Sequence, residues 1–274
     1  MTARRTADLL VTVALVALAA LFFFPLVWMV LSSFKTNSAI FSSPFALPTG
    51  FDLGRWAEAF EVGHIGQYAL NSAIVTAVSV TLILVIGAAA AFAFSRYRFP
   101  GRAAFMALFA LGLLLPLQSY FIAQSSLFTQ LEITDTRLAL IIPYTAMGLP
   151  LAIYLLKVYL DALPEELFDA ARIDGAGDLR VFRAVAMPLL VPGLATVAIF
   201  SALSAWNEFL LALLYIQDDA LKTIPTGLLA FSSRYVTDYS LLFSALSIIT
   251  IPMIVIYVVF NRRIVEGITA GSLK

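Results

Sequence analysis

The sequence predicts an all-α integral membrane protein with six transmembrane helices. Of its 274 residues, 61% are hydrophobic and only 12% are charged, and the mean hydropathy is +0.95. Long apolar runs also recur along the chain, and a hydrocarbon core of about 30 Å needs about 20 apolar residues per helix. The predicted spans are Leu9–Leu31, Ala73–Phe94, Ala103–Phe121, Leu138–Leu156, Leu190–Leu214 and Leu241–Phe260.

The first span follows the basic pair Arg4 and Arg5, and small residues at Ala17–Ala19 look like a signal-peptide cleavage site. Apolar sequence continues to Leu31, which is longer than a signal peptide requires, so we expect an uncleaved span. The Pro, Gly and Ser residues after it predict a loop and a short helix, and we expect Asn71 to cap the second span.

The third span is the least regular, because Pro116 and Gln118 interrupt it. Other prolines also lie in or beside the spans, where they kink or end helices, as is ordinary in membrane proteins. They are Pro143, Pro150, Pro192 and Pro252.

Basic residues predict the orientation, because Lys and Arg in short loops collect on the cytoplasmic side. Of the 17 basic residues, those assigned to the cytoplasm are Arg4, Arg5, Arg96, Arg98, Arg102, Lys157, Arg172, Arg180, Arg183, Arg262, Arg263 and Lys274. Both termini are therefore predicted to be cytoplasmic. The segments Lys35–Leu70, Glu132–Arg137 and Ile216–Tyr239 are predicted to lie outside.

A charged stretch, Leu163–Pro188, separates the fourth and fifth spans. Pro164 suits the first turn of a helix, which we expect to end at about Ile173. Gly175 and Gly177 are predicted to end it, because glycine adopts the left-handed backbone of a helix end.

Asp178 is predicted to cap a second short helix, Leu179–Ala186, which Pro188 joins to the fifth span. In the first short helix, one side would carry Leu167, Ala170, Ala171 and Asp174, and the other Glu165, Phe168, Asp169 and Arg172. The smooth alanine side is typical of a docking surface. A solvated connector on the lipid headgroups is the alternative.

The stretch also follows a recognisable pattern, carried by Pro164, Glu166, Leu167, Ala170, Ala171, Ile173, Asp174, Gly175, Ala176, Phe182, Pro188 and Leu189. It resembles the cytoplasmic EAA loop of permease subunits of binding-protein-dependent ABC importers, in the carbohydrate-uptake version. Asp169 stands where the family has glutamate, which helps to anchor the loop in an ATPase cleft. The resemblance implies a coupling role for Glu166, Asp169, Ala170, Ala171, Ile173, Asp174, Gly175, Phe182 and Pro188.

The resemblance extends over residues 71–274, through "NSAIVTAVSV", "AFAFSRYRFPGR", "SAWNEFLLAL" and "VEGITAGSLK". The C-terminal tail is similar to the segment of the maltose-type permease subunit that reaches the ATPase. This resemblance implies that the tail helps to couple the permease to the ATPase through Gly267, Thr269, Gly271 and Lys274. We therefore divide the chain into an N-terminal helix with an external segment, 1–70, and a permease core, 71–274, with the type I ABC importer fold.

The resemblance also implies the partners. The chain has no P-loop motif, so we expect it to bind no cofactor and a separate ATPase dimer to bind ATP and Mg²⁺. A second permease subunit and an extracytoplasmic sugar-binding protein would complete a carbohydrate importer in the bacterial cytoplasmic membrane. The net charge of zero offers no basic surface for nucleic acid.

Glu208 is the clearest acidic residue within a predicted span, where a charge costs about 2.5 to 3.5 kcal/mol on insertion scales. With Trp206 and Asn207 it offers an aromatic face and hydrogen-bond acceptors that suit a sugar. The alternative, which we favour, is that Asn207 and Glu208 bond to neighbouring helices or to the second subunit.

Other classes of function fit less well. The same architecture suits a transporter of glycerol phosphate, a polyol or another solute, whereas an ion-coupled transporter would give the charged loop no purpose. An intramembrane enzyme is disfavoured, because the chain lacks the catalytic residues that such enzymes use. It has no cysteine and one histidine, His64, and a lone histidine predicts no metal site.

Overall fold

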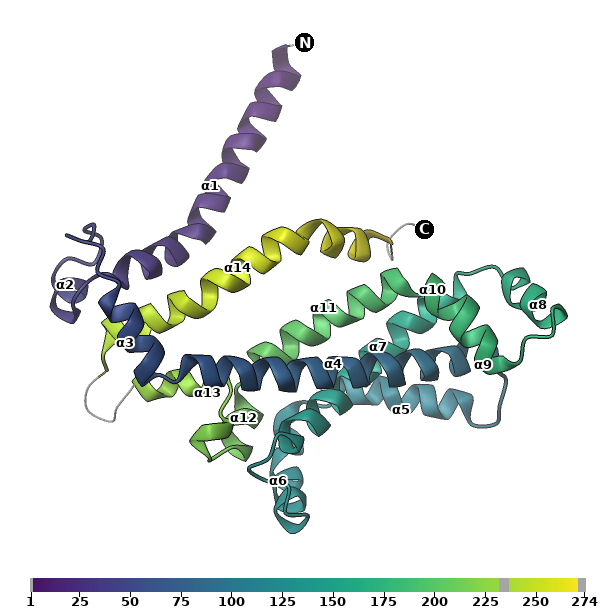
Figure 1. Cartoon of the computed structure of the whole chain (residues 1–274). Coiled ribbons are helices and arrows are strands. Elements are labelled where there is room, and N and C mark those ends of the chain that lie inside the picture. Colours follow the sequence, from purple (N-terminus) through teal and green to yellow (C-terminus); the bar gives the residue numbers. More distant parts are fainter. Residues whose placement is uncertain (1, 232–236, 271–274) are drawn as a thin grey trace. The chain divides into compact units, whose positions relative to one another are not determined.

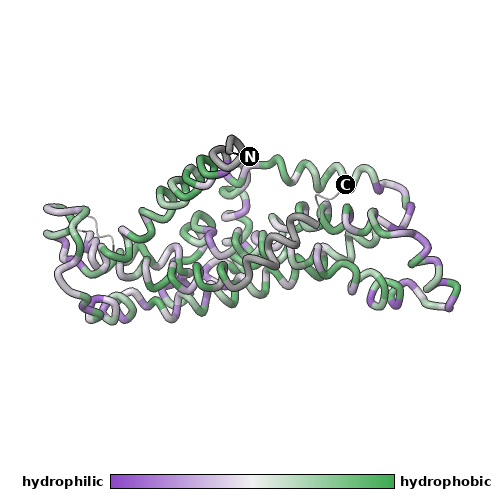
Figure 2. Tube along the Cα trace, turned by 90° about the horizontal axis from the view of Figure 1, so that it is seen from above, coloured by the Kyte–Doolittle hydropathy of each residue, from purple (hydrophilic) through white to green (hydrophobic). Residues whose placement is uncertain are grey.

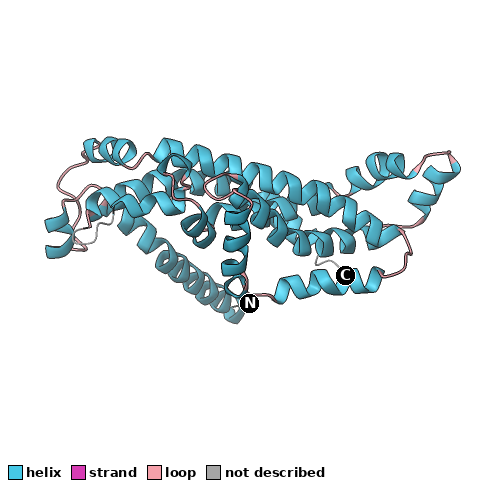
Figure 3. Ribbon diagram, turned by 90° about the horizontal axis from the view of Figure 1, so that it is seen from below, coloured by secondary structure: helices cyan, strands magenta, loops and turns pink. Residues whose placement is uncertain are grey.

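The computed structural model describes residues 2–231 and 237–270, and every regular element within them is a helix (Figures 1 and 3). The all-α prediction is thus confirmed. The longer helices are α1 (Thr2–Ser32), α4 (Ile65–Arg96), α5 (Arg102–Leu114), α6 (Phe121–Gln130), α7 (Leu138–Asp161), α11 (Val191–Asn207) and α14 (Tyr239–Ala270). The shorter ones are α2 (Asn37–Ser42), α3 (Gly54–Val62), α8 (Glu166–Ile173), α9 (Asp178–Val181), α10 (Met187–Leu189), α12 (Leu210–Tyr215) and α13 (Ile224–Gly227).

The helices form two compact units. One contains residues 1–66 and 227–256, and the other contains 67–226 and 257–274. The division of the chain at residue 70 remains a prediction. The first unit also includes residues 227–256, which the sequence division placed in the core.

Three of the predicted spans are single helices that are long and apolar enough to cross a membrane, namely Asp8–Ser32, Ile65–Arg96 and Leu138–Asp161. Hydrophobic residues run along these helices in Figure 2. A fourth candidate is the pair Asp178–Leu189 and Val191–Asn207, which bends by 73° at its break.

Two predicted spans are not continuous helices. In the third, α5 ends at Leu114 and a 3-10 turn, Leu117–Ser119, precedes α6. The cause is Pro116, because a proline pushes the preceding residue into extended backbone, and Leu115 has φ −74° and ψ 117°. In the fifth, α11 ends at Asn207, so Leu190–Leu214 is broken near Glu208.

In the sixth predicted span, the described apolar helix covers Tyr239–Val255, and the backbone of α14 continues to Ala270. The prediction that Asn71 caps the second span is wrong, because α4 begins at Ile65. Asn71 is buried inside this helix, where its amide nitrogen donates to the carbonyl oxygens of Ala220 and Lys222 at 2.8 and 3.0 Å.

In the second unit, α7 is the central helix, with contacts to α5, α11 and α12. Small residues let the helices approach closely. A Cβ atom built on Gly193 of α11 would lie 2.9 Å from Tyr159 Cδ2 and 3.3 Å from Leu156 Cδ2, both on α7. Glycine at residue 193 therefore sets the distance between α7 and α11.

In the first unit, polar bonds join the end of α1 to the start of α14. Ser240 Oγ donates to the Lys35 carbonyl oxygen at 2.7 Å, and Ser244 Oγ donates to that of Ser33 at 3.1 Å. The Trp56 indole of α3 donates to Ser33 Oγ at 3.0 Å. These bonds hold the C-terminal end of the first span against two other helices.

We expect Gly193→Val to lower the midpoint of thermal unfolding in detergent, because overpacking costs about 1 to 3 kcal/mol. Gly50→Val is the control, since a Cβ atom there meets nothing within 4 Å. Fluorescence-detected size exclusion after heating measures both variants. Equal midpoints for the two variants would contradict the close packing of α7 and α11.

Candidate functional site

The 163–188 loop contains two short helices joined by a glycine turn, as predicted. Gly175 has φ +78°, the left-handed conformation that favours glycine. Gly177 was wrongly predicted to share it, because its φ is −70°. Gly177 is itself the cap residue of α9, so the prediction that Asp178 caps this helix is also wrong.

The second short helix continues beyond its predicted end. After α9, residues Phe182–Ala186 form a π-helical turn, and α10 follows with Pro188 in its first turn. Proline suits this position because the first helical amide groups have no partner within the helix. Helical turns thus continue from α9 to α10, and the chain bends at the break between α10 and α11.

Phe168 anchors α8 from the side opposite the predicted docking side, where the helical spacing had grouped it with Glu165, Asp169 and Arg172. Its exposed fraction is 0%, and its ring centroid lies 6.5 Å from that of Phe92 on α4. The ring centroid of Phe182 lies 5.2 Å from that of Phe92. Ala171, one turn after Phe168, also packs toward this cluster instead of lying on the docking side.

Arg96 covers the Phe168 ring. Its guanidinium carbon lies 3.7 Å from the ring centroid, and its Nη2 donates to the Leu160 carbonyl oxygen at 2.5 Å. Beside it, Ser95 Oγ donates to Asp161 Oδ1 at 2.7 Å. One cation therefore joins the end of α4, the end of α7 and the aromatic anchor of α8.

The outer surface of α8 is formed by the residues that face away from this anchor, and we call it the α8 outer face. Ile173 is its most exposed apolar residue, with an exposed fraction of 85%. Asp169 pairs with Arg172 at 3.3 Å on the same exposed helix. The exposed members of the α8 outer face are Glu166, Leu167, Asp169, Ala170, Ile173 and Asp174.

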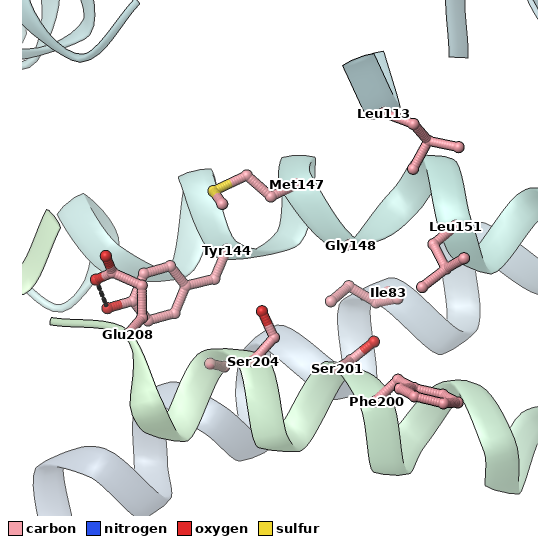
Figure 4. Close-up of a pocket in the computed structure, with 11 residues that line it drawn as sticks. Ile83, Leu113, Tyr144, Met147, Gly148, Leu151, Phe200, Ser201, Ser204 and Glu208 are labelled. Atoms are coloured by element: carbon pink, nitrogen blue, oxygen red, sulfur yellow. Dashed lines mark hydrogen bonds between the residues drawn. The ribbon is translucent and has the colours of Figure 1, made fainter. Parts of the chain in front are cut away.

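A second polar site lies along α7 and α11, around a cavity of about 170 Å³ (Figure 4). Glu208 lines it, and its Oε2 accepts a hydrogen bond from the Tyr144 hydroxyl at 2.7 Å. The backbone nitrogen of Leu211 donates to both carboxylate oxygens, at 2.9 and 3.1 Å, and that of Ala212 donates to Oε2 at 3.2 Å. Glu208 thus bonds to a neighbouring helix and caps the start of α12.

The other two predicted solute-contacting residues are placed differently. Trp206 and Asn207 are not among the residues lining this cavity. Asn207 Nδ2 donates to the Leu203 carbonyl oxygen of its own helix at 2.8 Å. Ser201 and Ser204 of α11 supply the cavity's other polar side chains, apart from Tyr144 and Glu208.

Sequence reasoning missed Tyr144 and Arg96 as site residues. Arg96 is the last residue of α4 and Tyr144 lies inside α7, and no local sequence pattern marks either of them. The predicted tail residues Gly267 and Thr269 lie in α14 where only the backbone is described, and Gly271 and Lys274 lie outside the described residues.

Comparisons with known proteins identify the family of this chain. A family profile described as "Binding-protein-dependent transport system inner membrane component" matches residues 83–269. The chain belongs to this family.

Other members of the family are similar over nearly the whole chain. The diacetylchitobiose uptake system permease protein NgcG of Streptomyces coelicolor is 37% identical over 91% of this chain and 83% of its own length. The arabinooligosaccharides transport system permease protein AraQ of Halalkalibacterium halodurans is 29% identical over 97% of this chain and 96% of its own.

A solved structure shares the fold. It is a chain of a bacterial ABC transporter involved in the import of the acidic polysaccharide alginate, and it superposes with a TM-score of 0.82 at 21% identity. The match covers 96% of this chain and 98% of that chain. This family member is thus a multi-pass inner membrane component with the fold of an ABC importer permease.

Phe168→Ala should lower the free energy of unfolding by about 3 to 5 kcal/mol, because it leaves a cavity in a closed aromatic cluster. Thermal unfolding in detergent measures this loss. Ile173→Ala on the α8 outer face is the matched control and should have little effect. A stable Phe168→Ala protein would show that the ring does not anchor α8.

The Tyr144–Glu208 bond should appear as a coupling energy of about 1.5 to 3 kcal/mol, the usual range for a hydrogen bond to a charged group. A double-mutant cycle with Tyr144→Phe and Glu208→Leu measures it from the unfolding of four proteins. Additive effects would mean that the bond does not stabilise the α7–α11 contact.

Proposed function

We propose that this chain is the permease subunit of an ATP-driven importer and that it moves a carbohydrate across the membrane. The relatives named above are described as uptake proteins for diacetylchitobiose and arabinooligosaccharides, and the structural relative belongs to a polysaccharide importer. The solutes in these descriptions are all carbohydrates, which supports a carbohydrate as the solute of this chain. The descriptions differ in the sugar, so they do not identify the particular one.

The observation that carries the proposal is the two-sided construction of α8. Its inner side is fixed to α4 and α7 through Phe168 and Arg96. The α8 outer face is exposed and carries Ile173 beside acidic and small residues. This is the arrangement needed by a lever, because a partner that moves the outer side must also move the helices attached to the inner side.

The partner on the α8 outer face would be one of two ATPase subunits, which bind ATP and Mg²⁺. A second permease subunit would complete the pore, and an extracytoplasmic binding protein would deliver the sugar. Both termini and the 163–188 loop would face the cytoplasm, as the distribution of basic residues predicts. The tail residues Gly267, Thr269, Gly271 and Lys274 remain predicted contacts of the ATPase.

Within the pore, we assign Glu208 to holding α7, α11 and α12 together, because its carboxylate, directly after α11, accepts bonds from Tyr144 of α7 and from the backbone of α12. The cavity lining contains no Lys or Arg, so this site favours a neutral solute over glycerol phosphate. Trp206 and Asn207 remain candidates for sugar contact in the assembled pore.

We expect Ile173→Asp to abolish recovery of the ATPase when the tagged permease is purified from native membranes, together with ATP-dependent uptake. An acid replaces an exposed apolar side chain on the proposed interface, so the permease itself should remain folded. The assay measures co-purified ATPase activity and uptake in proteoliposomes.

Val62→Asp is the matched control, because Val62 on α3 is 59% exposed and lies in the other compact unit. This variant should keep the ATPase and its uptake. Normal ATPase recovery by Ile173→Asp would overturn the assignment of the α8 outer face to the ATPase.

A further inference from the structure

The segment between α1 and α3 exposes an apolar surface that the transport mechanism does not use. No charged residue lies between Lys35 and Asp52. The exposed fractions of Phe45, Leu47 and Phe51 are 77%, 75% and 72%. In a soluble loop these side chains would be costly to leave in water, because each keeps most of its apolar area uncovered.

The segment folds back along the first span. The ring centroids of Phe45 and Phe24 are 6.2 Å apart, and the Trp28 indole donates to the Pro44 carbonyl oxygen at 2.8 Å. Phe24 precedes the end of α1 at Ser32 by eight residues, or about 12 Å along the helix axis at 1.5 Å per residue. Phe45 thus lies beside the apolar part of a membrane span, well before its end.

Polar backbone groups next to Phe45 have hydrogen-bond partners within the chain, as they must where water is scarce. Lys35 is 7% exposed, and its ammonium donates to the carbonyl oxygens of Ser43 and Pro44 at 3.3 and 3.0 Å. The backbone nitrogen of Ser43 donates to the Ala39 carbonyl oxygen, and that of Ala46 to the Ser43 carbonyl oxygen. Satisfied carbonyl groups matter here, because an unpaired polar backbone group is costly near lipid.

We propose that residues 41–53 form a lipid-contacting anchor, which holds the outer end of α1 in the interfacial layer of the bilayer. Phe45 and Leu47 insert beside the acyl chains, while Lys35 before the segment and Asp52 at its end are the polar residues that flank this apolar stretch. Lipid is favoured over a protein partner because Phe45 lies beside the apolar part of α1, a helix long and apolar enough to cross a membrane, and because no charged residue lies between Lys35 and Asp52. Aromatic side chains are also enriched at this level of membrane proteins.

The absence of cysteine allows a direct test with single-cysteine variants carrying a nitroxide label. The labelled permease is assembled with its partner subunits in lipid nanodiscs. Collision of the label with oxygen, which concentrates in the bilayer, is compared with collision with a water-soluble nickel chelate. Phe45→Cys and Leu47→Cys are the test positions, so that one failed variant leaves the other.

We expect labels at residues 45 and 47 to show an oxygen-to-nickel collision ratio several-fold higher than a label in Glu61→Cys, an exposed position on α3. A label in Phe24→Cys, on the exposed side of α1, serves as the bilayer reference. A ratio at residues 45 and 47 equal to that of Glu61→Cys would show that the segment lies in water. Protection from both reagents would show that a protein subunit covers it, and either result overturns the proposal.

Discussion

The burial of one aromatic ring, Phe168, is the contact on which the proposed coupling depends. Without it, α8 would be a short helix of eight residues, Glu166–Ile173, with charges at both ends and little reason to hold one position. With the ring enclosed, and with the Arg96 guanidinium 3.7 Å above it, the helix is attached to the ends of α4 and α7. A cation over a desolvated ring is worth about 2 kcal/mol or more. The attachment leaves the opposite side of α8 free for a partner.

The second constraint is the break between α11 and α12. A broken helix leaves amide groups without partners, and these are costly within a membrane protein. Glu208 resolves this cost locally, because its carboxylate accepts bonds from the backbone of Leu211 and Ala212 and from the Tyr144 hydroxyl. The break therefore supplies the reason for an acid in this position. Ser201 and Ser204 of α11 line the small cavity beside Glu208, and no basic side chain is among its lining residues.

The apolar helices and the glycine turn of the 163–188 loop could be predicted from the sequence. Long apolar runs and the glycine at residue 175 each permit few backbone conformations. The burial of Phe168 could not be predicted that way, since periodicity divides a short helix into two sides without saying which side meets other helices. Asn71 was mistaken for a cap because its polarity marks a helix start in a lone segment, whereas here it bonds to the carbonyl groups of Ala220 and Lys222, about 150 residues away in sequence. The Tyr144–Glu208 bond is likewise a tertiary contact.

The most direct test of the central claim is the number of solute molecules imported per ATP hydrolysed by the reconstituted transporter, in wild type and in Arg96→Leu. The substitution removes the contact between the cation and the ring and the bond to the Leu160 carbonyl oxygen, but it leaves the α8 outer face unchanged. If α8 acts as a lever held by Arg96, the variant should assemble with its ATPase and hydrolyse ATP while importing much less solute per ATP. An unchanged ratio in a correctly assembled complex would contradict this account.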